Sequence, residues 1–185
     1  MERVASLRQL LDTLGRAGLW SGIPHRRRRA ITNALRAGAD VTWTAGGAWW
    51  ADGEDLAEGE VETWLSGMAE PLSQCGLSLS VATITGPADG KSPGYALRLN
   101  GTRVDLYHFV DGQPGLPATV DPWTDCTVRP VAVVNRLLRA AGSDHRIAVF
   151  WPGTNDGLAV LGPENTLRQA TTDFATTGSD ECVLP

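Results

Sequence analysis

Two adjacent tryptophans are followed by a dense group of carboxylates, and this is the most distinctive feature of the sequence. The set comprises Trp49, Trp50, Asp52, Glu54, Asp55 and Glu58. Carboxylates in a first helical turn are stabilised by the helix dipole, and Asp55 is placed to cap a helix there. Because neighbouring strand residues point to opposite faces, we expect Trp49 or Trp50 to lie at the surface or beneath a partner, unless a helix covers one face and the last loop covers the other. An exposed tryptophan beside carboxylates is typical of a binding hot spot, so we predict that these six residues contact a protein partner.

A second group of residues could support acid–base or nucleophilic chemistry. Cys126 is expected near the start of a helix, where a thiolate is stabilised, and His108 could serve as its base. The other acid–base candidates are Asp105, Tyr107 and Asp125. They support an alternative function, a small bacterial enzyme acting on a peptide or secondary metabolite in a pocket beneath the 110–125 loop. No local feature pairs Cys126 with His108, so we assign no catalytic residue.

Nucleotide-binding and metal-binding motifs are missing from the sequence. Neither the dinucleotide fingerprint GxGxxG nor the P-loop pattern GxxxxGK[ST] occurs. His25, His108 and His145 are far apart and lack metal-ligand spacing. The carboxylates do not match the spacing of an EF-hand loop. We therefore predict neither a metal nor a cofactor.

Four consecutive arginines, Arg26–Arg29, stand at the predicted start of a helix. Positive charge is disfavoured at a helix N-terminus, so the run indicates a negatively charged partner. Two hypotheses account for it: the arginines contact an anion such as nucleic acid, or they pair within the chain with the acidic group. Four consecutive residues spread around a helix instead of forming one face, and the net charge of the chain is −5. Both facts disfavour nucleic acid as a partner.

Composition places the chain among globular proteins of one domain. Its 185 residues are enough to bury a core without disulfides or metal. The three cysteines are odd in number and lack CxxC spacing, which favours a reducing compartment. Charges interrupt the N-terminal segment where a signal peptide needs an apolar core, and no stretch approaches the ~20 apolar residues of a membrane span. We expect a cytoplasmic protein without membrane contact, and its oligomeric state stays open.

Apolar periodicity and turn residues predict the elements that position these side chains. Helices are predicted over 4–14, 24–38, 56–75 and 129–141, with a short one from residue 163. Strands are predicted over 41–44, 48–51, 77–81, 95–99, 102–109, 146–151 and 158–161. Gly46-Gly47 and Asn100-Gly101 are typical hairpin turns. The proline-rich stretch 110–125 predicts a long connection.

The predicted strands occur in hairpin-linked groups that are separated by helices. This order favours an α+β fold, with a mostly antiparallel sheet of hairpins and a meander and with helices packed largely on one face. A doubly wound parallel fold would need strict alternation of strands and helices, which is absent. We predict a single domain over residues 1–170 and a polar, mobile tail over 171–185.

Three segments together resemble small bacterial immunity-type proteins of toxin–immunity loci. They are WWADGEDLAEGEVETWL, the Asn-Gly hairpin and VVNRLLRAAGSDHRIAVFWPGTNDG, and the resemblance extends over half to two thirds of the chain. It implies a protein that binds and blocks a toxin, with an acidic aromatic surface placed over a basic active site. It assigns no individual functional residue. Our leading hypothesis is therefore a non-enzymatic binding protein, an immunity-type inhibitor that neutralises a cytoplasmic toxin through an acidic, Trp-rich surface.

Overall fold

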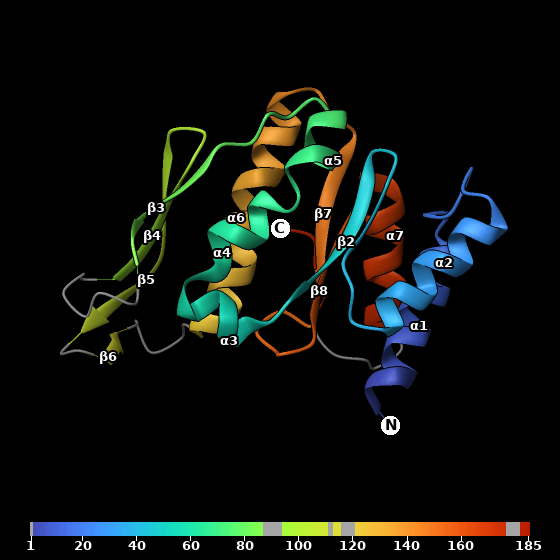
Figure 1. The fold of residues 1–185 in the computed structure, drawn as a ribbon, viewed down its shortest axis with the longest axis horizontal. Helices are drawn as coiled ribbons and strands as arrows, with labels where there is room; N and C mark the ends of the chain where they lie inside the picture. Colours follow the sequence, from blue (N-terminus) through green and yellow to red (C-terminus); the bar gives the residue numbers. More distant parts are fainter. Residues whose placement is uncertain (1, 87–93, 111–112, 116–120, 177–181) are drawn as a thin grey trace.

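The computed structural model describes residues 2–86, 94–110, 113–115, 121–176 and 182–185. These residues form four stacked layers in the order sheet, helices, sheet, helices (Figure 1). Every strand pair among them is antiparallel. The fold is α+β with hairpins and a meander, as the sequence predicts. The strands form two sheets, and helices cover both faces of the larger one.

The larger sheet is central and has five strands in the order β1-β2-β8-β7-β9. Their bounds are β1 Val41–Trp43, β2 Gly46–Ala51, β8 Gly157–Pro163, β7 His145–Phe150 and β9 Cys182–Val183. Alternate residues of β7 and β8 belong to two different cores. Ile147 and Leu161 pack in the inner core, whereas Phe150 and Leu158 pack in the outer core. Both faces of the sheet are thus buried, because side chains alternate along each strand.

The outer helical layer consists of α1 (Glu2–Arg16), α2 (His25–Arg36) and α7 (Glu164–Ala175). The predicted apolar stripe of α1 is buried at Leu7, Leu10, Leu11 and Leu14, which confirms the first helix. The predicted second helix is also confirmed, and it buries Ile31 and Leu35. No helix among the described residues is long and apolar enough to cross a membrane.

The inner helical layer lies between the two sheets. It consists of α3 (Gly53–Asp55), the π-helical turn η1 (Leu56–Glu60), α4 (Val61–Ser66), α5 (Ala69–Gln74) and α6 (Pro122–Ala140). The single helix predicted over 56–75 is therefore wrong, because the backbone breaks at Gly59, which has φ 128°. Helix α6 begins seven residues before the predicted Arg129. Asp121 caps it, and Pro122 occupies the first helical position that proline favours.

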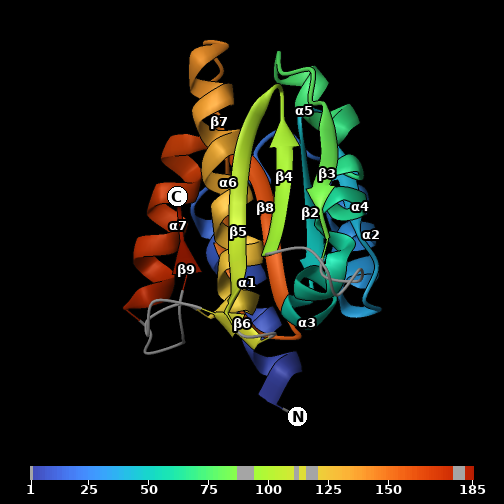
Figure 2. The same ribbon diagram turned by 90° about the vertical axis from the view of Figure 1, so that its left-hand side faces the viewer.

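The smaller sheet is a four-stranded meander in the order β3-β4-β5-β6, and it faces the viewer in Figure 2. Its strands are β3 (Val81–Thr85), β4 (Gly94–Leu99), β5 (Thr102–Val110) and β6 (Gln113–Gly115). The Asn100-Gly101 turn is confirmed, with both residues at positive φ. The strand predicted over 77–81 is shifted, since pairing begins at Val81.

The Gly46-Gly47 pair serves a different purpose from the one predicted. The β1–β2 turn falls at Thr44 and Ala45, and both glycines lie within β2. A Cβ at Gly47 would lie 2.3 Å from Cη2 of Trp49. The glycines are therefore needed to leave room for neighbouring indole rings, not to turn the chain.

Residues 171–176 and 182–185 are part of the fold, which corrects the predicted polar tail over 171–185. Helix α7 continues to Ala175 and buries Phe174 in the outer core. Cys182 and Val183 pair with β7 at one edge of the central sheet. The backbone oxygen of Pro185 accepts a hydrogen bond from the buried Asn135 amide at 2.9 Å. Residues 177–181 lie outside the described residues.

Candidate functional site

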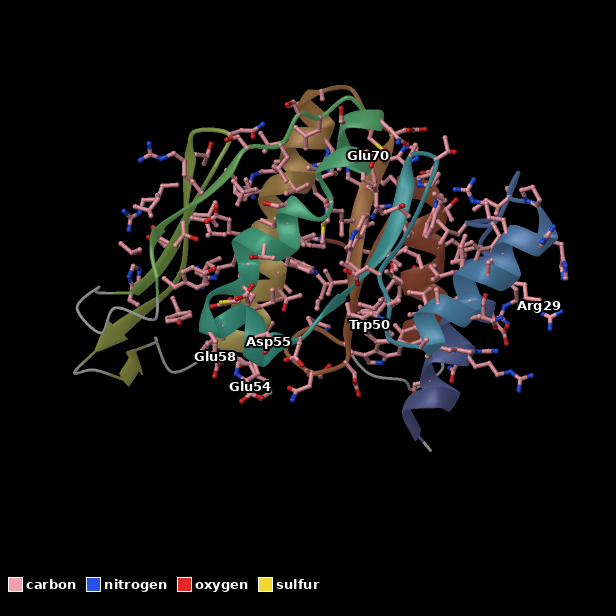
Figure 3. All side chains as sticks on the ribbon, in the orientation of Figure 1. Arg29, Trp50, Glu54, Asp55, Glu58 and Glu70 are labelled. Carbon is pink, nitrogen blue, oxygen red and sulfur yellow. The ribbon has the colours of Figure 1, made fainter. Side chains whose placement is uncertain are left out.

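Exposed carboxylates gather where the inner helical layer reaches the end of β2. Figure 3 shows Glu54, Asp55 and Glu58 together at this edge, on α3 and η1. The start of α6 packs against the start of α3. The contact is close, since a Cβ at Gly53 would lie 2.9 Å from the Cβ of Trp123. We call the resulting surface the acidic edge, and it comprises Asp52, Glu54, Asp55, Glu58 and Asp121.

Two of these carboxylates cap helices. The Asp52 side chain accepts hydrogen bonds from the backbone N–H groups of Glu54 and Asp55, at 3.0 and 3.3 Å. Asp52 is therefore the cap, which corrects the placement of Asp55 in that role. Asp121 accepts from the backbone N–H of Trp123 at 3.1 Å. Helix capping explains why Asp52 and Asp121 are aspartates, because each stabilises the helix that it caps. Glu54 and Asp55 cap no helix and are stabilised only by the helix dipole.

Two buried tyrosines hold the turn that carries Glu58. The hydroxyl of Tyr95 on β4 donates to the carbonyl oxygen of Gly59 at 2.9 Å. The hydroxyl of Tyr107 on β5 donates to the carbonyl oxygen of Ala57 at 2.8 Å. Burial raises the pKa of Tyr107 to about 12 and also raises that of Tyr95, so both hydroxyls keep their protons at neutral pH. The π-helical turn is thus fixed from outside its own backbone.

The negative charge of the acidic edge is uncompensated within the described part of the chain. No lysine or arginine occurs in the sequence between Arg36 and Lys91. Among the described residues, no cationic side chain forms an ion pair with Glu54, Asp55 or Glu58. The hydrogen bond to Glu54 comes from a neutral amide, Nδ2 of Asn155, at 3.5 Å.

The arginine run does not neutralise this charge. Arg26–Arg29 are all exposed on α2. Arg29 lies on the far side of the central sheet from Glu54 and Glu58 (Figure 3). The intramolecular pairing considered from the sequence is therefore not formed, and the molecule is electrically polarised.

The tryptophans predicted to anchor the surface lie elsewhere. Trp49 is only 2% exposed and packs in the inner core, which corrects its assignment to the contact surface. Trp50 is half-buried against the outer core. The physical reason is that helices cover both faces of the central sheet, so strand alternation puts one indole into each core. The aromatic side chain beside the acidic edge is Trp123, which is half-buried.

Trp123 and Asp121 were missed from the sequence, although a signal for them was present. The sequence Asp121-Pro122 is typical of a cap followed by the first residue of a helix. That signal would have begun α6 at Pro122 and brought Trp123 into its first turn. Its closeness to Gly53 could not have been predicted, since the two positions are far apart in the chain.

The residues proposed for nucleophilic chemistry are not brought together. Cys126 is fully buried, and burial raises the pKa of its thiol well above the usual range. His108 is exposed on β5. The thiol is therefore protonated and shielded from solvent, which is the opposite of a reactive cysteine. Residues 111–112 and 116–120 of the predicted overlying loop lie outside the described residues.

The other acid–base candidates have structural partners. Asp105 pairs with Arg103 at 2.7 Å, and Asp125 pairs with Arg129 at 2.8 Å. The Tyr107 hydroxyl is engaged with η1, as described above. The chain also contains one GxSxG pattern, Gly90–Gly94, whose serine lies outside the described residues. The pattern leads into strand β4, whereas a nucleophile elbow opens a helix.

Within the described residues, no group of three or more histidine, cysteine, aspartate or glutamate side chains could hold a metal ion. The acidic edge is thus a group of carboxylates that caps two helices and leaves three further negative charges exposed. Comparisons with known protein families, with curated proteins and with solved structures find no match for this chain.

Proposed function

We propose that this chain is a non-enzymatic binding protein that holds a basic protein partner through the acidic edge. The observation that supports this most strongly is the combination of exposure and rigidity. Glu58 projects from the turn that Tyr95 and Tyr107 fix, and Glu54 and Asp55 project from the adjoining α3, which Asp52 caps. None of the three carboxylates has a cationic partner among the described residues. A preorganised surface loses little conformational entropy when it binds.

The three exposed carboxylates repel one another, because they lie on one short segment. A partner that brings lysine or arginine to the edge relieves this repulsion and adds attraction. Such charges mainly raise the association rate, from a range of about 10⁵–10⁶ M⁻¹s⁻¹ towards 10⁸ M⁻¹s⁻¹ or more at low salt. The half-buried Trp123, whose Cβ lies against Gly53, supplies an apolar side chain beside these carboxylates, and tryptophan is enriched among hot-spot residues.

The class of partner follows from charge complementarity. Proteins that act on nucleic acids or other polyanions have basic active sites, and an acidic edge on a rigid scaffold can cover such a site. We therefore propose an immunity-type inhibitor that neutralises a cytoplasmic toxin, in keeping with the resemblance of the sequence to immunity-type proteins. In this proposal the acidic edge occupies the toxin's substrate-binding surface.

The test is capture of the partner by the wild-type chain and by a charge-removed variant. The variant E54Q/D55N/E58Q keeps the shape of the edge and removes the three charges that cap no helix. The matched control is E70Q, because Glu70 is exposed on α5 at a distance from the edge (Figure 3). We expect wild type and E70Q to retain one basic protein from a lysate of the source organism, and the triple variant to lose it.

The finer proposal needs a measurement on the captured protein. Expressed alone, that protein should arrest growth or degrade its substrate, and an equimolar amount of wild-type chain should suppress the activity. The triple variant should need at least about tenfold more protein for the same effect, which corresponds to 1.4 kcal/mol of binding free energy. Equal capture by wild type and the triple variant would contradict the assignment of the edge. A captured protein without toxic activity would contradict the immunity-type role alone.

A further inference from the structure

Positive charge is concentrated at the end of the molecule opposite to the acidic edge. Residues 1–40 contain eight arginines and three carboxylates, a net charge of +5, although the whole chain has a net charge of −5. The helices of this stretch are α1 and α2, and they lie side by side on the outer face of the central sheet (Figure 1). An open groove of about 790 Å³ runs between them.

The groove is lined by arginines from both helices. Arg28, Arg29 and Arg36 line it from α2, and Arg16 lines it from α1. Arg29 and Arg36 are seven residues apart, two helical turns, so they lie on the same face and roughly 10 Å apart along the axis. Asp12 is the one carboxylate among the lining residues. Among the described residues, none of the four arginines forms an ion pair.

The first turn of α2 lacks the residues that normally stabilise a helix N-terminus. Its N-cap position is Pro24, which makes no side-chain hydrogen bond, and its first turn has no acidic residue. The run Arg26–Arg29 places positive charge where the helix dipole disfavours it. A bound polyanion would offset both effects, because it accepts hydrogen bonds from free N–H groups and neutralises the guanidinium charge.

The remaining lining residues suit a nucleotide chain better than an acidic protein. Trp20 lines the groove, and its position is fixed by a hydrogen bond from its indole N–H to the Leu11 carbonyl oxygen at 3.3 Å. Thr32 and Asn33 supply neutral hydrogen-bonding groups between the arginines. Arginines that follow a backbone, with an aromatic ring beside them, are the arrangement used to bind single strands. A double helix is too wide to enter a groove between two packed helices.

We propose that the groove between α1 and α2 binds a short stretch of single-stranded nucleic acid. Arg28, Arg29 and Arg36 contact phosphates from the α2 wall, Arg16 contacts a phosphate from the opposite wall, and Trp20 contacts a base. The expectation that net charge disfavours nucleic acid applies to the molecule as a whole. It does not apply to this end, which the central sheet separates from the acidic edge. The proposal does not depend on the function proposed for that edge.

Fluorescence anisotropy with labelled twelve-residue oligo-dT and oligo-U, at 50 and 200 mM salt, tests the proposal. If four arginines each neutralise one phosphate, affinity falls about 50-fold over this salt range. The variant R29Q/R36Q should bind at least tenfold more weakly at 50 mM salt, and its affinity should fall only about 7-fold over the same range. The matched control R98Q/R136Q removes two exposed arginines from β4 and α6 and should bind like wild type.

Three results would overturn the proposal. They are no binding of either oligonucleotide at 50 mM salt, equal binding by wild type and R29Q/R36Q, and displacement by polyglutamate at the same charge concentration. The last result would identify an acidic protein as the occupant. W20F should weaken binding while leaving the salt dependence unchanged, because it removes a base contact and no phosphate contact. The variant E54Q/D55N/E58Q should bind the oligonucleotides like wild type. A negative result for the groove can therefore be distinguished from a negative result for partner binding by the acidic edge.

Discussion

The tyrosine contacts with η1 give the sharpest prediction about the acidic edge. Replacement of Tyr95 or Tyr107 by phenylalanine removes one hydroxyl and leaves the ring in place. The carbonyl oxygen of Gly59 or Ala57 then loses its donor. The two rings also contact each other edge to face, with centroids 5.9 Å apart, and that contact is preserved in either variant. The substitutions therefore isolate the hydrogen bonds that fix the turn.

The expected loss of stability follows from the environment of each bond. A neutral hydrogen bond contributes about 0.5–1.5 kcal/mol net, and a fully buried orphaned group costs about 1–3 kcal/mol. Gly59 and Ala57 are half-buried, so water replaces part of the lost interaction. We expect each single variant to lose about 1 kcal/mol and the double variant about 2 kcal/mol. For a chain of this length, the double variant should melt about 4–8 °C lower.

The assay is urea unfolding followed by tryptophan fluorescence, with T172V as the control. Thr172 donates to the Arg168 carbonyl oxygen on the exposed face of α7, so its loss should cost less than about 0.5 kcal/mol. A loss of less than about 0.5 kcal/mol in Y95F/Y107F would refute the idea that these hydroxyls fix η1.

Alkaline pH provides an independent check on Tyr107. Its pKa is raised in the folded chain to about 12 from an ordinary value of 10, chiefly by burial. The corresponding stability is fully present below pH 10 and is lost as pH rises through 12. Wild type should therefore lose stability over this range, and Y107F should lose less. Equal loss in both chains would contradict the burial of an ionisable hydroxyl at this position.

Further outcomes are expected at three other positions of the fold. E164Q should lose about 3 kcal/mol at neutral pH, because it leaves the buried Arg146 guanidinium without its carboxylate, and urea midpoints will show whether it does. The pKa of Glu164 is lowered chiefly by its hydrogen bond to Arg168 and also by the charge of Arg146. This stability is therefore present above pH 4.5 and lost as pH falls further, and a wild-type chain with no acid-side loss would be inconsistent with these contacts. G47A should lose at least about 1–3 kcal/mol because its Cβ meets an indole at 2.3 Å, whereas G86A, with 3.8 Å to the nearest atom, should unfold like wild type. Thiol titration of the native chain should leave Cys126 unmodified until urea is added, and rapid labelling of that cysteine would show that it is not buried.

Elements with strong local signals could be predicted from the sequence. Helix α1 follows from its leucine spacing, and the β4–β5 hairpin follows from Asn100-Gly101. The break at Gly59 could not be predicted, because the helical period continues through it. The hydroxyls that take up the freed carbonyl oxygens come from strands 36 and 50 residues away. The local sequence pattern at Gly59 favours a continuous helix, whereas the hydrogen bonds from Tyr95 and Tyr107 stabilise the break that the structure shows.

The exposure of the charged residues of the candidate site could be predicted from the sequence, but the positions of its aromatic residues could not. Glu54, Asp55 and Glu58 are exposed, as charged residues in a first turn usually are. Strand alternation places Trp49 and Trp50 on opposite faces, but it does not say whether each face is covered. Both faces are covered here, since the fold has helices on each side of the central sheet. Trp123 lies at the edge instead, through a contact that only the tertiary structure creates.

The central claim is that the acidic edge attracts a basic protein partner. The most direct test is the association rate of the captured partner with wild type, E54Q/D55N/E58Q and E70Q at 50 and 200 mM salt. We expect the wild-type rate to exceed that of the triple variant at least about tenfold at 50 mM salt and to fall steeply at 200 mM, with E70Q behaving like wild type. Equal association rates for wild type and the triple variant at both salt concentrations would contradict the claim.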